Sequence, residues 1–170
     1  QYLINRGLDS VLNDTVLTAA IDTVQELNIS STLPSDPDIY DLTGIEDFSS
    51  LRVLSCESNL ITSLDLSNNL LLEYLYCQGN LITHLDVSSN LLLADLHCGS
   101  NPGIDSLDLS ANINLEWFNC SNPNNFSLSF LNLGYKPVLN YLNAANNQLS
   151  SLDASGCINL KFLFVNDNNL

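Results

Sequence analysis

The sequence predicts a solenoid, a stack of coils that each contribute a short strand and a turn. The first observation is a motif that repeats every 21 residues, with Leu at its first and fourth positions, Cys at the sixth and Asn at the ninth. Complete copies occupy residues 51–59, 72–80 and 93–101. A single unit of this length is too small to bury its own apolar side, so consecutive units must stack.

Further units with the same leucine spacing begin at Leu115, Leu139 and Leu160. The successive periods are therefore 21, 21, 22, 24 and 21 residues. The extra residues fall at 102–103 and 121–125, where Pro, Gly and Asn favour turns. We expect this added length to bulge from one edge without breaking the stack.

Each unit also contains a second half with the pattern of a strand. Residues 62–67, 83–88 and 105–110 alternate apolar and polar side chains, as a half-buried strand does. The predicted fold is therefore a solenoid with mostly short parallel strands on both sides and few helices.

The first 50 residues differ from the repeats. Residues 1–23 show two short amphipathic patterns, which predict a helical cap over the N-terminal end of the stack. Residues 24–50 predict an irregular first coil, and residues 51–170 the regular repeats. The last unit stops at Leu170 with an apolar end, so we expect the regular repeats to be truncated there and the natural chain to continue.

Composition narrows the classes of partner. The chain of 170 residues has 19 acids and four bases, a net charge of −15 and an apolar content of 45%, which fits a folded domain. Its charge repels phosphate backbones and anionic lipids, which excludes nucleic acid and bare membrane as favourable partners. No apolar run reaches the roughly 20 residues that span a bilayer. The chain begins at Gln1 without a cleavable leader, so we expect a signal peptide to have been removed.

Two residue types recur at fixed positions and are predicted to be structural. The cysteines replace an inward leucine and lack metal-ligand spacing, so we interpret them as core thiols. They are Cys56, Cys77, Cys98 and Cys120. The asparagines follow three residues later, where a buried amide would satisfy backbone groups of its own coil and the next. They include Asn59, Asn80, Asn101 and Asn147.

Aromatic residues concentrate on one face of the predicted stack. Side chains alternate along a strand, which leaves 18 outward positions on the first strands of the six units. These positions hold six of the chain's 13 aromatic residues, several times the number that an even spread would give. We therefore predict a ligand-binding strip made of Tyr74, Tyr76, His97, Trp117, Asn119 and Tyr141.

Two interpretations of the strip remain open. Exposed rings beside amide and carboxylate groups suit a protein partner, which we favour, or a glycan. Cross-strand packing is the structural alternative, because aromatic pairs stabilise a pleated face by about 0.2 to 1 kcal/mol each.

The second halves carry a row of outward carboxylates. Parallel pairing would place Asp65, Asp86 and Asp108 about 5 Å apart, close enough for mutual repulsion. A calcium ion would relieve that repulsion, but it needs six to eight oxygen ligands and a flat row offers few. The main interpretation is therefore a solvated acidic face that keeps the protein soluble.

The residues give little support for catalysis. The two histidines, His84 and His97, fall on opposite sides of the predicted stack. No activated nucleophile or Gly-rich phosphate loop accompanies them. The sequence therefore indicates a protein that is not an enzyme and needs no cofactor.

The repeat form Leu-x-x-Leu-x-Cys-x-x-Asn-x-Leu-Thr-x-Leu-Asp-Leu-Ser resembles the internalin-like leucine-rich repeats of bacterial surface proteins. The resemblance covers residues 24–170, and the opening residues 1–10 are similar to the helical caps that precede such repeats. It implies a secreted or cell-surface bacterial protein that acts by adhesion or recognition of a protein or glycan. The alternative is a structural spacer that displays flanking domains and has no ligand of its own.

Overall fold

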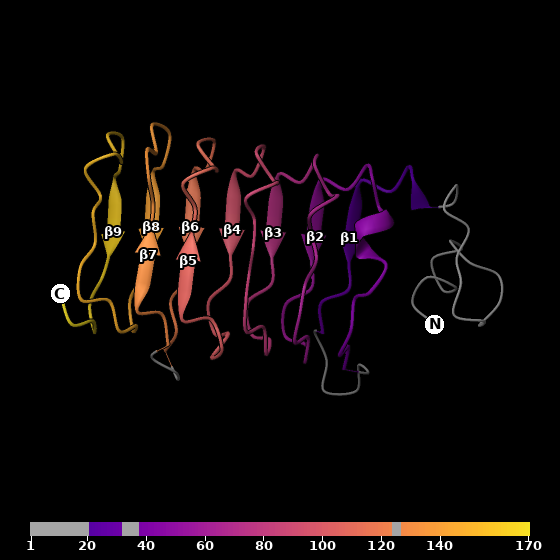
Figure 1. The fold of residues 1–170 in the computed structure, drawn as a ribbon, viewed down its shortest axis with the longest axis horizontal. Coiled ribbons are helices and arrows are strands. Elements are labelled where there is room, and N and C mark those ends of the chain that lie inside the picture. Colours follow the sequence, from indigo (N-terminus) through magenta and orange to yellow (C-terminus); the bar gives the residue numbers. More distant parts are fainter. Residues whose placement is uncertain (1–20, 32–37, 124–126) are drawn as a thin grey trace.

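The computed structural model describes residues 21–31, 38–123 and 127–170. In these residues the chain forms one row of stacked coils, in sequence order from the N-terminal to the C-terminal end (Figure 1). The prediction of a solenoid of short parallel strands is confirmed. The predicted helical cap lies almost entirely outside the described residues.

One side of the stack is a parallel sheet with one three-residue strand from each coil. Neighbouring strands pair in exact register, so that Val53 lies beside Tyr74 and Tyr74 lies beside Asp95. The seven strands, in spatial order, are β1 (Glu26–Asn28), β2 (Val53–Ser55), β3 (Tyr74–Tyr76), β4 (Asp95–His97), β6 (Trp117–Asn119), β8 (Tyr141–Asn143) and β9 (Phe162–Phe164).

The middle residue of each strand faces the interior and drives the stacking. Leu54, Leu75 and Leu96 are completely buried, and Phe118 and Leu142 continue the same column. Leu163 in β9 is 47% exposed, because no strand among the described residues pairs with the far edge of β9. The first coil adds a 3-10 helix, Ile45–Asp47, whose Ile45 is buried in the same core.

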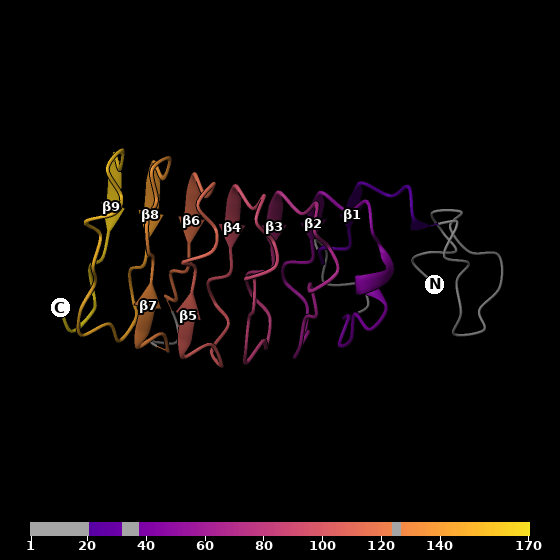
Figure 2. The same cartoon turned by 45° about the horizontal axis from the view of Figure 1, so that its top comes forward.

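The opposite side of the stack is only partly a sheet. There β5 (Ser106–Asp108) pairs in parallel with β7 (Phe130–Asn132), as Figure 2 shows. Residues 62–67 and 83–88 keep the predicted alternation of burial but form no strand ladder. A groove of about 180 Å³ on this side is lined by residues of both segments.

A column of asparagine side chains ties each coil to the next beneath the sheet. The side chain of Asn80 accepts a hydrogen bond from the Ile61 N–H at 3.0 Å. Its amide group donates to the carbonyl oxygens of Cys56 and Cys77, each at 3.0 Å. Two of these three partners belong to the preceding coil. Equivalent bonds are made by Asn59, Asn101, Asn147 and Asn168.

A second column lies on the other side of the core. Asn90 donates to the carbonyl oxygens of Leu66 and Asn69, and Asn112 repeats the arrangement one coil later. In the following coil Lys136 takes the asparagine position, and its Nζ donates to the Leu109 carbonyl at 2.7 Å. Lys136 is fully buried, and burial lowers the pKa of its ammonium group.

The first column is interrupted where the repeat is longest. Asn122 lies one residue before the expected position and donates to the Ser127 hydroxyl at 2.7 Å instead of to the preceding coil. The Ile104 N–H, which would bond to an asparagine side chain in the regular pattern, bonds to the Asn101 carbonyl. At the longer repeat, the hydrogen bonds from an asparagine side chain to the preceding coil are therefore missing, yet β4 and β6 remain in register.

The cysteines form a column of buried thiols. All five cysteines are buried and free. Burial raises the pKa of Cys98 to about 12, and burial with a smaller effect of the Glu57 charge raises the pKa of Cys56 to about 12. Neutral thiols are therefore the form that the core accepts.

Replacing Asn80 with leucine tests the asparagine column. Asn80→Leu leaves the Ile61 N–H without a partner in the core, and it removes one of the two asparagine donors of the Cys56 and Cys77 carbonyl oxygens. We therefore expect a loss of about 3 kcal/mol in the free energy of unfolding. Urea unfolding measures it. Asn114→Leu is the control, because Asn114 is exposed and bonds only to Leu91, and its change should stay within about 0.5 kcal/mol. Equal losses in the two variants would contradict the role of the column.

The thiol column predicts loss of stability in alkali. Unfolded thiols release their protons near pH 9, whereas Cys98 and Cys56 hold theirs to about pH 12 in the folded protein. The protonated thiols stabilise the folded protein fully below pH 9. As the pH rises from 9 to about 12, the free energy of unfolding therefore falls by about 1.4 kcal/mol per pH unit for each thiol. Urea unfolding under reducing conditions measures this free energy at each pH. It should fall less steeply with pH in Cys98→Ala, a substitution that places alanine where the same column already has Ala144. The same pH dependence in the parent and the variant would contradict a contribution of the Cys98 thiol.

Candidate functional site

The outward face of the seven-stranded sheet places the predicted strip in rows. Exact register puts Tyr74, Asp95, Trp117, Tyr141 and Phe162 in one row across β3, β4, β6, β8 and β9. Tyr76, His97, Asn119, Asn143 and Phe164 form the second row. The predicted outward residues therefore share one face, as the repeat spacing requires.

The rings gather at the C-terminal half of this face. The Trp117 and Tyr141 rings stack, with centroids 4.9 Å apart and an angle of 18° between their planes. Tyr141 also contacts Phe162 and Phe164, at centroid distances of 6.3 and 5.6 Å. Trp117 remains 45% exposed, so the same rings pack across the strands and present a surface to solvent. We call Trp117, Tyr141, Phe162 and Phe164 the ring cluster.

A polar group occupies the neighbouring strands. The Tyr76 hydroxyl donates to Asp95 Oδ2 at 2.9 Å, and His97 Nε2 lies 3.2 Å from Asp95 Oδ1. The Tyr76 and His97 rings meet edge to face, with centroids 5.3 Å apart. Burial, the hydrogen bond to Asp95 and the charges of Asp95 and Glu57 raise the pKa of Tyr76 to about 12. The Tyr76 hydroxyl is therefore a donor held by a carboxylate.

The six predicted strip residues thus divide into groups. Tyr76 and His97 lie together around Asp95, and Trp117 and Tyr141 lie together in the ring cluster. Tyr74 shares a row with Trp117 and is 38% exposed. Asn119 differs from the rest, because its side-chain oxygen accepts a hydrogen bond from the Ser121 N–H at 3.0 Å and so serves the local turn.

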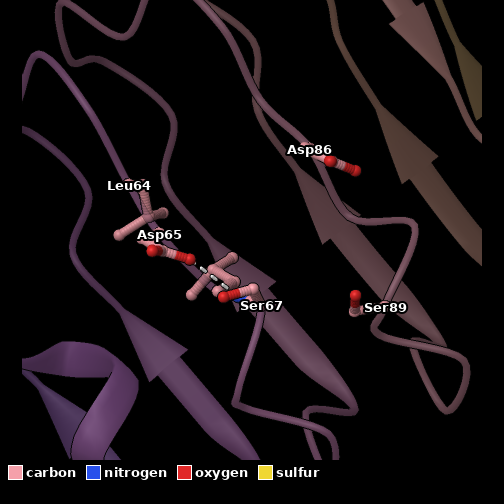
Figure 3. A pocket seen from close by; sticks show the side chains of 6 residues that line it. Leu64, Asp65, Ser67, Asp86 and Ser89 are labelled. Carbon is pink, nitrogen blue, oxygen red and sulfur yellow. Dashed lines mark hydrogen bonds between the residues drawn. The ribbon is translucent and has the colours of Figure 1, made fainter.

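The carboxylates on the opposite side each bind their own turn. Asp65 accepts from the Ser67 N–H at 3.0 Å (Figure 3). Asp86 and Asp108 accept in the same way from the N–H of the serine two residues further on. Hydrogen bonds to these serines lower the pKa of all three carboxyl groups. Within residues 21–31, 38–123 and 127–170, no three acidic, histidine or cysteine side chains gather as metal ligands. Each of the three aspartates therefore closes its own turn.

The histidines lie on different sides of the molecule. His84 lines a groove of about 350 Å³ beside β5, whereas His97 lies in β4 of the large sheet. The two histidines therefore lie on opposite sides of the stack, as the repeat register predicts. No helix of the described residues is long and apolar enough to cross a membrane.

A row of exposed aliphatic side chains was not anticipated from the sequence. It occupies the centres of the turns that lead into the strands, where hydrogen bonds such as Leu72 N–H to Asn69 O close each turn. Turn centres usually carry polar residues. Apolar pairs directly after the asparagine in the second half of a unit, such as Leu70 and Leu71 after Asn69, could therefore have revealed this row in the sequence. We call this row the turn ridge. It contains Leu70, Leu71, Leu91, Leu92, Ile113, Val138 and Ile158.

A second missed feature is a set of buried oxygens on the sheet face. Glu57 Oε2, Gln78 Oε1 and Asp95 Oδ1 are shielded from solvent and form no hydrogen bond among the described residues, although His97 Nε2 lies 3.2 Å from the Asp95 oxygen. The repeat predicted that these side chains point outward, but it gave no indication of how their neighbours cover them.

Several solved structures resemble this one. InlJ from Listeria monocytogenes, whose functional domain includes a cysteine ladder, matches 91% of this chain and 42% of its own at 29% identity and a TM-score of 0.53. A leucine-rich repeat protein from Leptospira interrogans matches 88% of this chain and 40% of its own at 25% identity and a TM-score of 0.70. The chain therefore spans about two fifths of the length of these two proteins.

Internalin C2 from Listeria monocytogenes matches 90% of this chain and 66% of its own at 23% identity and a TM-score of 0.71, which supports the fold. No protein-family model and no curated protein matches the sequence. The structural matches nevertheless agree with the parallel-strand architecture and the repeat spacing. The chain is an internalin-like leucine-rich repeat solenoid. This internalin-like chain carries its own column of buried cysteines in consecutive coils, at Cys56, Cys77, Cys98 and Cys120.

Proposed function

We propose that this solenoid is a non-catalytic recognition module of a secreted or cell-surface bacterial protein. Its ligand, a protein or a glycan, binds on the outward face of the large sheet, along Tyr74, Tyr76, His97, Trp117, Asn119 and Tyr141. The similarity to internalins supports an interaction module, and the bacterial sources of the similar structures support the bacterial origin.

The single observation that carries the proposal is the exposed ring cluster. Trp117 stacks on Tyr141 and still leaves 45% of its surface exposed. A ring pair already held in place loses little conformational freedom on binding, which is the property of a binding hot spot. A protein partner is favoured over a glycan because the face also carries carboxylate and amide groups that suit a peptide's donors.

The structural spacer remains the second candidate, and one observation favours it. Tyr141 contacts Trp117, Phe162 and Phe164, which is the cross-strand packing that a purely structural sheet would use. A spacer would have no ligand for the isolated chain. It would also keep its function after every exposed ring on the face is replaced with serine.

Substitution of the stacked pair tests the recognition module. Trp117→Ala and Tyr141→Ala should each weaken binding by about tenfold or more, because each removes a ring from the centre of the surface. A glycan array and affinity capture from surface-protein extracts supply the ligands. Trp117 is the only tryptophan, so its fluorescence reports contact directly.

Ile158→Ala is the matched control, because it removes an exposed apolar side chain from the turn ridge and leaves the sheet face intact. Full binding by both ring variants to every ligand of the parent protein would exclude the sheet face. Loss in the Ile158 variant alone would place the binding surface on the turn ridge.

A further inference from the structure

The outward sheet face is chemically divided along its length. The coils of β2, β3 and β4 present the oxygens of Glu57, Gln78 and Asp95, whereas β6, β8 and β9 present the ring cluster. Glu57 and Gln78 lie in consecutive coils, each two residues beyond the paired Ser55 and Tyr76. A ligand that covers both halves therefore needs hydrogen-bond donors at one end and an apolar group at the other.

Some oxygens of the half that β2, β3 and β4 form have no hydrogen-bond partner among the described residues. Glu57 Oε2 and Gln78 Oε1 have no donor among the described residues, and Asp95 Oδ1 approaches His97 Nε2 without a well-aligned hydrogen bond. Ser30 Oγ, in the preceding coil, is likewise buried and unpartnered. Buried acceptors without donors are costly, and a ligand that supplies donors relieves that cost.

The bases of the chain do not supply the missing donors. Arg52 pairs with Glu73, and Lys136 is buried on the other side of the core, where it donates to the Leu109 carbonyl. Lys161 directly precedes β9, at the far end of the sheet from β2. Arg6 lies outside the described residues. The structure shows no ion pair for Glu57 among the described residues, and the base beside Asp95 is His97, so these two carboxylates form an acidic patch without a lysine or arginine partner.

The strand spacing sets the distance between the two halves. Neighbouring strands lie about 4.8 Å apart, so β4 and β8 are separated by about 10 Å and β2 and β8 by about 19 Å. An extended peptide advances about 3.3 Å per residue, so about three to six residues cover these distances.

We propose that the sheet face recognises an extended peptide segment of a partner protein that carries a basic side chain about three to six residues from a large apolar one. The basic group lies against the half-buried side chains of Glu57, Gln78 and Asp95, which turn outward so that their shielded oxygens accept its N–H donors. The apolar side chain lies on the stacked rings of Trp117 and Tyr141. This assignment rests on the proposed recognition function and specifies the chemistry of its partner.

An array of synthetic peptides tests the assignment on the intact protein. Each peptide carries one arginine and one tryptophan separated by one to about eight serine or glycine residues, in both orders. We expect binding to peak at separations of about three to six residues and to fall when arginine is replaced with glutamine or tryptophan with alanine. Raising the salt from about 50 to about 500 mM should weaken binding, because the attraction is electrostatic.

Variants of the protein locate the basic group. Glu57→Gln and Asp95→Asn should each weaken the best peptide by about tenfold, and the double variant should lose most of the salt dependence. Asp153→Asn is the control, because it removes one negative charge from the opposite side of the solenoid and should leave binding unchanged. Unchanged urea midpoints confirm that the variants are folded.

The possible results separate this assignment from the function on which it rests. Equal binding of the arginine and glutamine peptides, unchanged binding by both carboxylate variants, or no peptide bound at all would overturn the assignment. If a glycan binds instead and depends on Trp117 without salt dependence, the recognition function stands and the basic-peptide assignment fails. If no ligand of any kind depends on Trp117, the recognition function fails as well.

Discussion

The hydrogen bonds from buried asparagine side chains to neighbouring coils are the interaction on which the rest of the structure depends. A coil of about 21 residues has too few residues to pair its own inward backbone groups, and each strand contributes only three residues to the sheet. One amide supplies an acceptor and two donors, so Asn80 binds Ile61 N–H and the carbonyl oxygens of Cys56 and Cys77 at once. Because two of these partners lie in the preceding coil, the bonds also fix the coils in register.

Register is what turns a one-dimensional repeat into a surface. With Tyr74 beside Asp95 and Asp95 beside Trp117, residues about 21 apart in sequence become neighbours about 4.8 Å apart. Rings in adjacent coils then stack, and carboxylates in adjacent coils add their charges. On the opposite side, the strand ladder of the described residues is limited to β5 and β7, and two grooves there are lined by residues of neighbouring coils. In the described residues the molecule therefore has one continuous seven-stranded face and an opposite side on which β5 and β7 pair.

The interruptions of the asparagine columns show how much irregularity the stack accepts. Asn122 bonds to Ser127 and not to the preceding coil, yet β4 and β6 remain in register. Lys136 replaces an asparagine and reaches the same kind of carbonyl with a longer side chain, at the cost of burying an amine. The core tolerates such substitutions because a carbonyl oxygen needs a donor of any type, and because the strand ladder on the sheet side supplies independent hydrogen bonds.

The repeat spacing by itself determined the solenoid, the buried columns of leucine, cysteine and asparagine, and the face on which Tyr76, Trp117 and Tyr141 lie. These follow because strand alternation and a fixed period decide which side chains point inward. Only the tertiary structure decided that Trp117 stacks on Tyr141, that Asp95 holds the Tyr76 hydroxyl, that Asp65 and Asp86 bind their own turns, and that the turn ridge is exposed. These features depend on rotamers and on the spacing of neighbouring coils, which a linear period does not specify.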